Sequence, residues 1–162
     1  MNASVNNRQP NRLMANSGFT LIELMVTIAV LAIIVSIAAP SISTQLANQR
    51  VKSTASTLTN ALKETKAESA IRRQPLTISI DSTNKIINVQ RVVAGQVEST
   101  IATYKYSIES KVNSSQSSNE FKPNKAADAV TYTICDSNNT ASPITIKVSA
   151  TAIISNRSEG VC

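Results

Sequence analysis

Hydrophobic and polar positions divide the chain into segments of different character. Residues 19–39 form an almost uninterrupted apolar run, in which 17 of 21 residues are apolar and Glu23 is the only charge. At ~1.5 Å per residue, a helix of this length reaches about 32 Å, enough to cross a hydrocarbon core of about 30 Å. A cleavable signal peptide is the alternative, although its apolar region is usually shorter, roughly 7–15 residues. The run therefore predicts a transmembrane helix over residues 19–40.

The apolar residues beyond this run recur at spacings of three and four. They are Ile42, Leu46, Val51, Ala55, Leu58 and Leu62. Polar residues fill the gaps, which is typical of an amphipathic helix with one packed face. Pro40 lacks a backbone N–H, so we expect a kink between the two halves. We assign residues 41–72 to the amphipathic half and expect its helical turns to end near Ala70.

The pattern changes to period two after the helix. Apolar and polar residues alternate over 76–80, and Asp81–Asn84 supplies turn residues before the chain returns. Further strands are expected at 85–93, 100–108, 129–135 and 144–154. The polar stretch Asn113–Asn119 is typical of a surface loop. Strands that follow one another closely favour a mainly antiparallel sheet, which would pack on the amphipathic half of the helix outside the membrane. We therefore predict an α+β fold with a β-rich domain over residues 73–162.

The composition excludes most kinds of catalysis. The chain contains no His, which removes Ser-His-Asp and Cys-His nucleophiles and His-bearing metal sites. Two Cys residues do not make a zinc site without other ligands, and a net charge of +6 is too dilute for a tail that coats nucleic acid. We expect no catalytic residue, no metal and no cofactor, and a protein that is not an enzyme.

Glu23 is an ionisable residue inside an apolar segment. An ionised carboxylate at the centre of a bilayer costs roughly 2.5–3.5 kcal/mol on insertion scales, and less near the edge. No Lys or Arg lies between residues 13 and 49, so a partner amine would have to be a free α-amino group made by cleavage just upstream. The alternative is that Glu23 reaches the cytoplasmic interface without a partner.

The charges that flank the apolar run predict its orientation. Arg8 and Arg12 precede the run, and the next charge after it is Arg50. By the positive-inside rule the N-terminus is expected in the cytoplasm and the remainder is expected to be exported. An oxidising compartment would let Cys135 and Cys162 form a disulfide, which closes a loop of about 28 residues and is worth roughly 3–4 kcal/mol. Two free thiols are the alternative.

The residues Ser17-Gly18-Phe19-Thr20-Leu21-Ile22-Glu23-Leu24, followed by an apolar helix and Pro40, resemble the N-terminal signature of type IV pilins and type II secretion pseudopilins. The resemblance implies a type IV pilin fold and cleavage by prepilin peptidase after Gly18, so that residues 1–18 are a leader peptide. It also implies N-methylation of Phe19, and pairing of Glu23 with a terminal amine during filament assembly. Met14 as the true start would shorten the leader to MANSG and remove both arginines.

The later part of the chain is similar to the FimT/FimU/GspH group of minor subunits. A helix that ends within Lys66–Pro75 and enters a strand directly carries this resemblance, together with a cysteine in mid-domain. Some members of the group bind DNA through a Gly-Arg-x-Arg element, whose place here is Ala150–Arg157. Ala152 and Ile153 stand where the glycine and the first arginine are expected. The element is therefore broken, and Arg157 is left as a candidate DNA contact.

Four cations gather near the expected end of the helix: Lys63, Lys66, Arg72 and Arg73. One interpretation is a basic patch for DNA or an acidic partner. The other, which we favour, is the stabilising placement of cations at a helix C-terminus, diluted by Glu64 and Glu68.

The resemblance implies a structural minor pilin, similar to FimU, that is assembled into a type IV pilus or primes its assembly. A GspH-like minor pseudopilin of type II secretion and a FimT-like pilin for DNA uptake in natural transformation are the alternatives. The implied partners are other major and minor pilins, prepilin peptidase, the inner-membrane assembly platform and, before assembly, the lipid bilayer, with nucleic acid less favoured. The implied location is the bacterial inner membrane, with a cytoplasmic N-terminus and a periplasmic C-terminal domain, and then the pilus.

Overall fold

The computed structural model describes residues 18–137 and 142–162, apart from the side chains of residues 38–40. Most of the expected leader peptide therefore lies outside the described residues. The chain divides into two compact units, Met1–Ala39 and Pro40–Cys162.

One long helix, α1 (Leu21–Arg72), contains 52 residues. Its second half carries the packed face that the spacing of apolar residues predicts. The buried apolar residues of this face are Ala47, Val51, Ala55, Leu58, Ala61 and Leu62. Ile42 and Leu46 share the same spacing but are exposed, so the packed face begins later than expected.

The C-terminus of α1 is a Schellman motif. The N–H of Gln74 donates to the carbonyl oxygen of Ser69 at 3.2 Å, and Arg73 adopts a left-handed conformation with φ of 54°. Pro75 follows, which cannot continue a helix. The cap lets α1 extend slightly beyond Ala70.

The first sheet has four antiparallel strands in the order β3-β2-β1-β5. Its strands are β1 (Leu76–Asp81), β2 (Ile86–Val93), β3 (Gln96–Lys105) and β5 (Ser118–Phe121). Ile78 pairs with Val89 and Ile80 with Ile87, and all four apolar side chains contribute to the core or pack against it. The alternation of apolar and polar residues therefore predicts this hairpin correctly.

The second sheet has four antiparallel strands in the order β4-β6-β7-β8. Its strands are β4 (Ser110–Ser114), β6 (Val130–Asp136), β7 (Ile144–Val148) and β8 (Ile154–Arg157). The last strand, β8, lies beside α1, because Asn156 Nδ2 donates to Thr59 Oγ1 at 3.0 Å.

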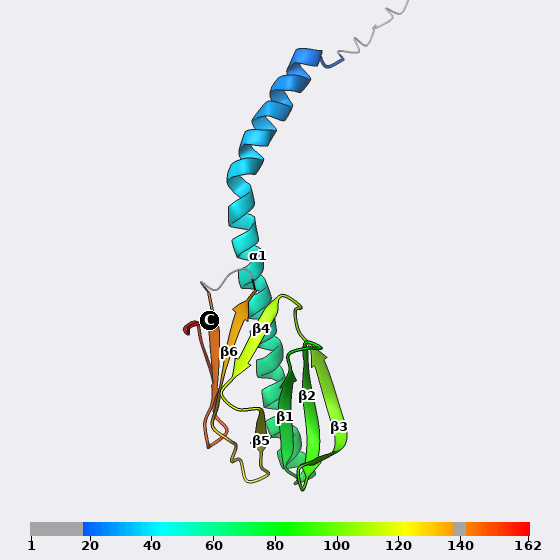
Figure 1. The fold of residues 1–162 in the computed structure, drawn as a ribbon, viewed down its shortest axis with the longest axis vertical. Helices are drawn as coiled ribbons and strands as arrows, with labels where there is room; N and C mark the ends of the chain where they lie inside the picture. The colour runs from blue at the N-terminus through cyan, green and yellow to red at the C-terminus, as the bar shows by residue number, and fades with distance from the viewer. Residues whose placement is uncertain (1–17, 138–141) are drawn as a thin grey trace, which may run out of the picture. The chain divides into compact units, whose positions relative to one another are not determined.

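Both sheets pack against the second half of α1 (Figure 1). One hydrophobic cluster joins the helix to both sheets, and its largest members include Leu58, Leu62, Ile78, Ile87, Phe121, Tyr132, Ile134 and Ile146. Thr54 Oγ1 donates to Ser110 Oγ at 2.9 Å in the interior, and Lys66 Nζ donates to the carbonyl oxygen of Ala152 at 2.7 Å. The fold is α+β, with a long N-terminal helix packed on antiparallel sheets.

The expected loop over Asn113–Asn119 is wrong in part. Strands β4 and β5 enter this stretch from its two ends, and only residues 115–117 lie between them. Asn119 is fully buried, pairs with Ile78 and donates from Nδ2 to the carbonyl oxygen of Asp128 at 3.1 Å. The polar composition of this stretch did not predict strands. Their backbone hydrogen bonds are made with β6 and β1, which are distant in the sequence.

Two expected strands also have different bounds, and the strands form two sheets where one was expected. The expected strand 144–154 is broken by a tight turn in which Ala152 N–H donates to the carbonyl oxygen of Ser149 at 2.9 Å. Ala152 has φ of 53° there, which a strand residue does not adopt. The expected strand 100–108 runs from Gln96 to Lys105.

Candidate functional site

The helix begins immediately after the predicted cleavage point. Gly18 has no neighbouring atom within 4 Å of the position its Cβ would occupy, and Phe19 is 79% exposed. Thr20 is the N-cap, because its Oγ1 accepts from the N–H of Glu23 at 3.2 Å and its carbonyl oxygen accepts from the N–H of Leu24 at 3.2 Å. The bond between Gly18 and Phe19 therefore lies in exposed, non-helical chain just before the first turn.

Glu23 lies in that first turn. Thr20 and Glu23 have the spacing of a capping box, and a carboxylate near a helix N-terminus interacts favourably with the helix dipole. A carboxylate at position 23 therefore also stabilises the start of the helix. The first turn supplies no positively charged side chain, and the apolar segment itself contains no Lys or Arg that could pair with Glu23.

Residues Leu21–Ile37 present apolar side chains on every side. The exposed fraction of their large apolar residues runs from 50% at Val30 to 76% at Leu21. The hydroxyls in this segment are satisfied within the helix: Thr27 Oγ1 donates to the Leu24 carbonyl oxygen and Ser36 Oγ to that of Ile33, both at 2.8 Å. A helix that is apolar all round requires lipid or other helices around it.

The length and hydropathy of the described helices bear on whether one of them could cross a membrane. No single described helix is long and apolar enough to cross alone, whereas the segments Leu21–Ile37 and Ser41–Arg72 meet the criterion together. Pro40 lies between them among the residues whose side chains are not described, so the kink there stays a prediction.

The C-terminus is fastened to the second sheet. Cys135 and Cys162 form a disulfide with a Cα–Cα distance of 6.0 Å. The hydroxyl of Thr145 donates to the carbonyl oxygen of Glu159. Gly160 has φ of +141°, and a Cβ there would lie 2.7 Å from Thr145 Oγ1, so this close approach requires glycine. These contacts hold the tail against β6 and β7.

Arg157 lies at the end of β8, and its Nη1 is 3.5 Å from Glu159 Oε1. In the preceding turn Ala152, at the place of the expected glycine, has φ of 53°, a conformation that glycine adopts more easily than alanine. Ile153 is 63% exposed but carries no charge. The place expected for the first arginine is therefore exposed but uncharged, and Arg157 as a DNA contact stays a prediction.

The four cations near the end of α1 do not form one patch. Lys66 donates to the Ala152 carbonyl oxygen, and Arg72 Nε lies 2.6 Å from Glu68 Oε2. Lys63 instead lines a groove between α1 and β8. This distribution agrees with local stabilisation of the helix. The groove was not predicted, because its walls come from segments that lie far apart in the sequence.

The shifted titratable groups lie in the β-domain. Hydrogen bonds from Asn84 and Thr83 lower the pKa of Asp81. Burial, followed by a hydrogen bond to Glu64, raises the pKa of Tyr104 to about 12. Across residues 18–137 and 142–162, no group of three or more His, Cys, Asp or Glu side chains could hold a metal ion.

Comparisons with known proteins agree with both the motif and the fold. Residues 13–39 match the prokaryotic N-terminal methylation motif, whereas no curated protein matches the chain significantly. The crystal structure of the type IV minor pilin FimU from Pseudomonas aeruginosa superposes with a TM-score of 0.60 at 15% identity, covering 67% of this chain and 89% of FimU. The minor pseudopilin EpsH from the type 2 secretion system of Vibrio cholerae gives a TM-score of 0.58 at 8% identity, covering 67% and 97%.

Identities this low show a shared fold alone, and the motif match is confined to residues 13–39. Together they define a class of protein in which a prepilin-type N-terminus precedes a long helix and an antiparallel β-domain. The chain is therefore similar to type IV pilins in its N-terminal motif, and to a minor pilin and a minor pseudopilin in its fold.

Proposed function

We propose that this chain is a minor pilin, similar to FimU, that is processed in the inner membrane and then assembled into a type IV pilus or primes its assembly. The observation that carries the proposal is a prepilin-type motif at the start of a helix that is apolar on every side over Leu21–Ile37. The likeness of the β-domain to FimU in fold supports it.

Processing begins with cleavage after Gly18. A peptidase needs an extended bond, and this bond precedes the N-cap Thr20 in exposed chain. Removal of residues 1–18 leaves Phe19 as the first residue. Methylation of the Phe19 amine leaves the new N-terminus positively charged. Because the N-terminus is expected in the cytoplasm, this charge starts on the cytoplasmic side of the membrane.

Assembly moves the segment 19–40 from lipid into a bundle of neighbouring helices. The apolar side chains of Leu21–Ile37 exchange lipid contacts for helix contacts, and residues 41–72 carry the β-domain, residues 73–162, on the outside. The carboxylate of Glu23 pairs with the α-amino group of Phe19 in a neighbouring subunit, because an unpaired charge in apolar surroundings is costly. This pairing sets the axial register of the subunit.

Replacement of Glu23 tests this step. We expect Glu23→Ala to lower the amount of the protein in sheared filaments by about tenfold or more, with its level in membranes preserved, since removing one partner of a buried charge pair is strongly unfavourable. Glu23→Asp, which keeps the charge, should recover part of the incorporation. Glu68→Ala, on the same helix beyond the apolar segment, is the matched control. Wild-type incorporation of Glu23→Ala would sink the assembly role.

Intact mass tests the processing steps. Protein from sheared filaments should have the mass of residues 19–162 plus one methyl group and minus two hydrogens for the disulfide. An unprocessed mass in the presence of an active prepilin peptidase would contradict the prepilin role.

The fold likeness to EpsH supports a second candidate, a minor pseudopilin of type II secretion. Recovery from sheared pili favours the pilus, whereas loss of secretion on deletion, with normal pili, favours the pseudopilus. The DNA-uptake alternative rests on Arg157 and a broken element. It predicts electrophoretic shifts of DNA that weaken with salt.

A further inference from the structure

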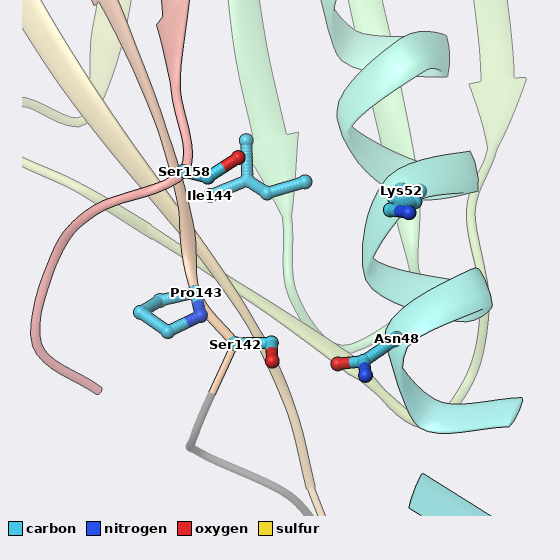
Figure 2. A pocket seen from close by; sticks show the side chains of 6 residues that line it. All are labelled: Asn48, Lys52, Ser142, Pro143, Ile144 and Ser158. Atoms are coloured by element: carbon cyan, nitrogen blue, oxygen red, sulfur yellow. The ribbon is translucent and has the colours of Figure 1, made fainter. Parts of the chain in front are cut away.

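A polar groove runs along α1 beside the edge strand β8. Two adjoining hollows of about 300 and 380 Å³ form it, and they share Lys52, Ile144 and Ser158 as lining residues. Figure 2 shows Asn48 and Lys52 of α1 on one side of the first hollow, with Ile144, at the start of β7, and Ser158, just after β8, on the other side. The groove lies entirely within the unit Pro40–Cys162.

The charge in this groove is all positive. Its charged lining residues in the described chain are Lys52, Lys63 and Arg157. Lys52 and Lys63 lie about three helical turns apart, which places their Cα atoms on one face of α1 about 16 Å apart along its axis. Among the described residues neither lysine has an ion pair, whereas Arg157 contacts Glu159.

The acidic residues of the second half of α1 do not neutralise the groove. Glu64 accepts a hydrogen bond from the hydroxyl of Tyr104, and Glu68 pairs with Arg72. Neither of these carboxylates lines the groove. Lys52 and Lys63 are therefore exposed without a paired carboxylate among the described residues, whereas Arg157 is paired with Glu159.

Neutral hydrogen-bond donors lie between the cations. Ser56 and Asn60 project from α1, and Asn156 and Ser158 from the opposite wall. The hydrogen bond from Asn156 Nδ2 to Thr59 Oγ1 joins the two walls. An extended chain rises about 3.3 Å per residue, so roughly five residues span the distance between Lys52 and Lys63. Because β8 is the last strand of its sheet, its outer edge also offers backbone groups to such a chain.

We propose that this groove binds an extended acidic segment of a neighbouring filament subunit, with carboxylates against Lys52 and Lys63. The proposal rests on the proposed function, which supplies the neighbour. A second copy of this chain is a poor occupant, because without the two arginines of residues 1–18 its net charge is still +4. Duplex DNA is less suited, since phosphate binding uses several converging cations over a broad surface and this groove is narrow, with its lysines at separate points.

Binding of a defined peptide tests the groove directly. The probe is a fluorescein-labelled octapeptide of alternating Glu and Thr, titrated against the full chain in nonionic detergent at low salt. The groove variant is K52E/K63E, and the matched control K111E/K147E makes the same change in net charge. Lys111 and Lys147 are exposed neighbours of the buried Val112 and Ile146, so they lie on the outer face of the second sheet.

We expect the groove variant to bind the acidic peptide about tenfold more weakly than wild type, and the control variant to stay within about twofold. An octapeptide of alternating Gln and Thr is the neutral control, and it should show no comparable binding. Equal weakening by both variants would overturn the proposal, because it would trace binding to net charge. Tighter binding of a 20-base-pair duplex, with the same dependence on Lys52 and Lys63, would overturn it in favour of nucleic acid.

Incorporation in cells separates this inference from the proposed function. With filament assembly intact, K52E/K63E should be processed normally but depleted from sheared filaments, whereas K111E/K147E should be incorporated like wild type. Equal incorporation of both variants would overturn the groove as a subunit contact and leave the pilin role standing. If wild type itself never enters filaments, the pilin role fails and with it the neighbouring subunit as occupant, while the peptide titration still decides whether the groove binds acidic chains.

Discussion

Arg73 holds a backbone conformation that glycine adopts more easily. Its φ of 54° closes α1 in the Schellman motif, its side chain is exposed, and a non-glycine residue in this region is strained by roughly 1 kcal/mol. We expect Arg73→Gly to raise the free energy of unfolding by about 0.5 kcal/mol, since part of the relief is offset by greater freedom of the unfolded chain. Urea unfolding followed by circular dichroism measures the change. Arg73→Ala keeps the Cβ and should give no gain, so an equal gain from both variants would contradict the strain.

Asp81 ties together the turn between β1 and β2. Its Oδ1 accepts from the N–H groups of Thr83 and Asn84 at 2.9 Å each, and its Oδ2 accepts from Asn84 Nδ2 at 2.7 Å. The backbone hydrogen bond from Asn84 is the main reason that the pKa of Asp81 is lowered. A lowered pKa in the folded state means that the ionised carboxylate stabilises the fold above the unfolded pKa of about 4, and that this contribution is lost as the pH falls through the native pKa.

The pH dependence of Asp81→Asn measures this contribution. The unfolding midpoint of wild type should exceed that of Asp81→Asn at neutral pH, and the difference should shrink as the pH falls from about 6 to about 3. The other carboxylates titrate in both proteins, so the difference isolates Asp81. A difference that is constant with pH would show that the charge plays no part in holding the turn.

The disulfide acts on an element, the C-terminal tail, rather than on one residue. Cys135 and Cys162 are separated by 27 residues, and the bond ties the end of β6 to the last residue of the chain. Replacing both cysteines by Ser should lower the free energy of unfolding by about 3–4 kcal/mol, because the unfolded chain regains the entropy of an open loop. Chemical reduction of wild type should reproduce the loss. Stability unchanged by both treatments would mean that Thr145 and Gly160 hold the tail unaided.

The elements that the sequence predicts correctly are those with a strong local period. The buried positions Val51, Leu58 and Leu62 repeat with the helix, and Ile78 alternates with polar neighbours, so α1 and the first hairpin follow from spacing. Strand β5 does not, since Asn119 is polar and becomes buried only by pairing with Ile78 in a distant strand. The break between β7 and β8 depends on the left-handed φ of Ala152. The sequence has no glycine there that would have predicted this turn.

The same contrast holds at the scale of the whole molecule. The N-terminal motif is local, so Gly18, Phe19 and Glu23 are identified as candidates from the sequence alone. The groove instead needs Lys52 on the helix and Arg157 on the last strand to be brought to one place by two sheets. Only the folded chain shows this juxtaposition, because the contact between α1 and β8 depends on tertiary packing and not on a local pattern.

The three tyrosines report on the integrity of the folded β-domain as a whole. Burial raises the pKa of Tyr106 and of Tyr132, and burial together with Glu64 raises that of Tyr104 to about 12. A raised pKa means that the neutral phenols stabilise the fold fully below the unfolded pKa of about 10, and that this stabilisation is lost as the pH rises toward 12. At about pH 10.5 the native protein should therefore show little tyrosinate absorbance at about 295 nm, whereas in denaturant roughly three quarters of the phenols should be ionised. Tyr104→Phe should lower the denatured signal by one third and leave the native signal unchanged. A native titration with its midpoint near pH 10 would mean that the phenols reach water, and that the two sheets do not close on α1 as described.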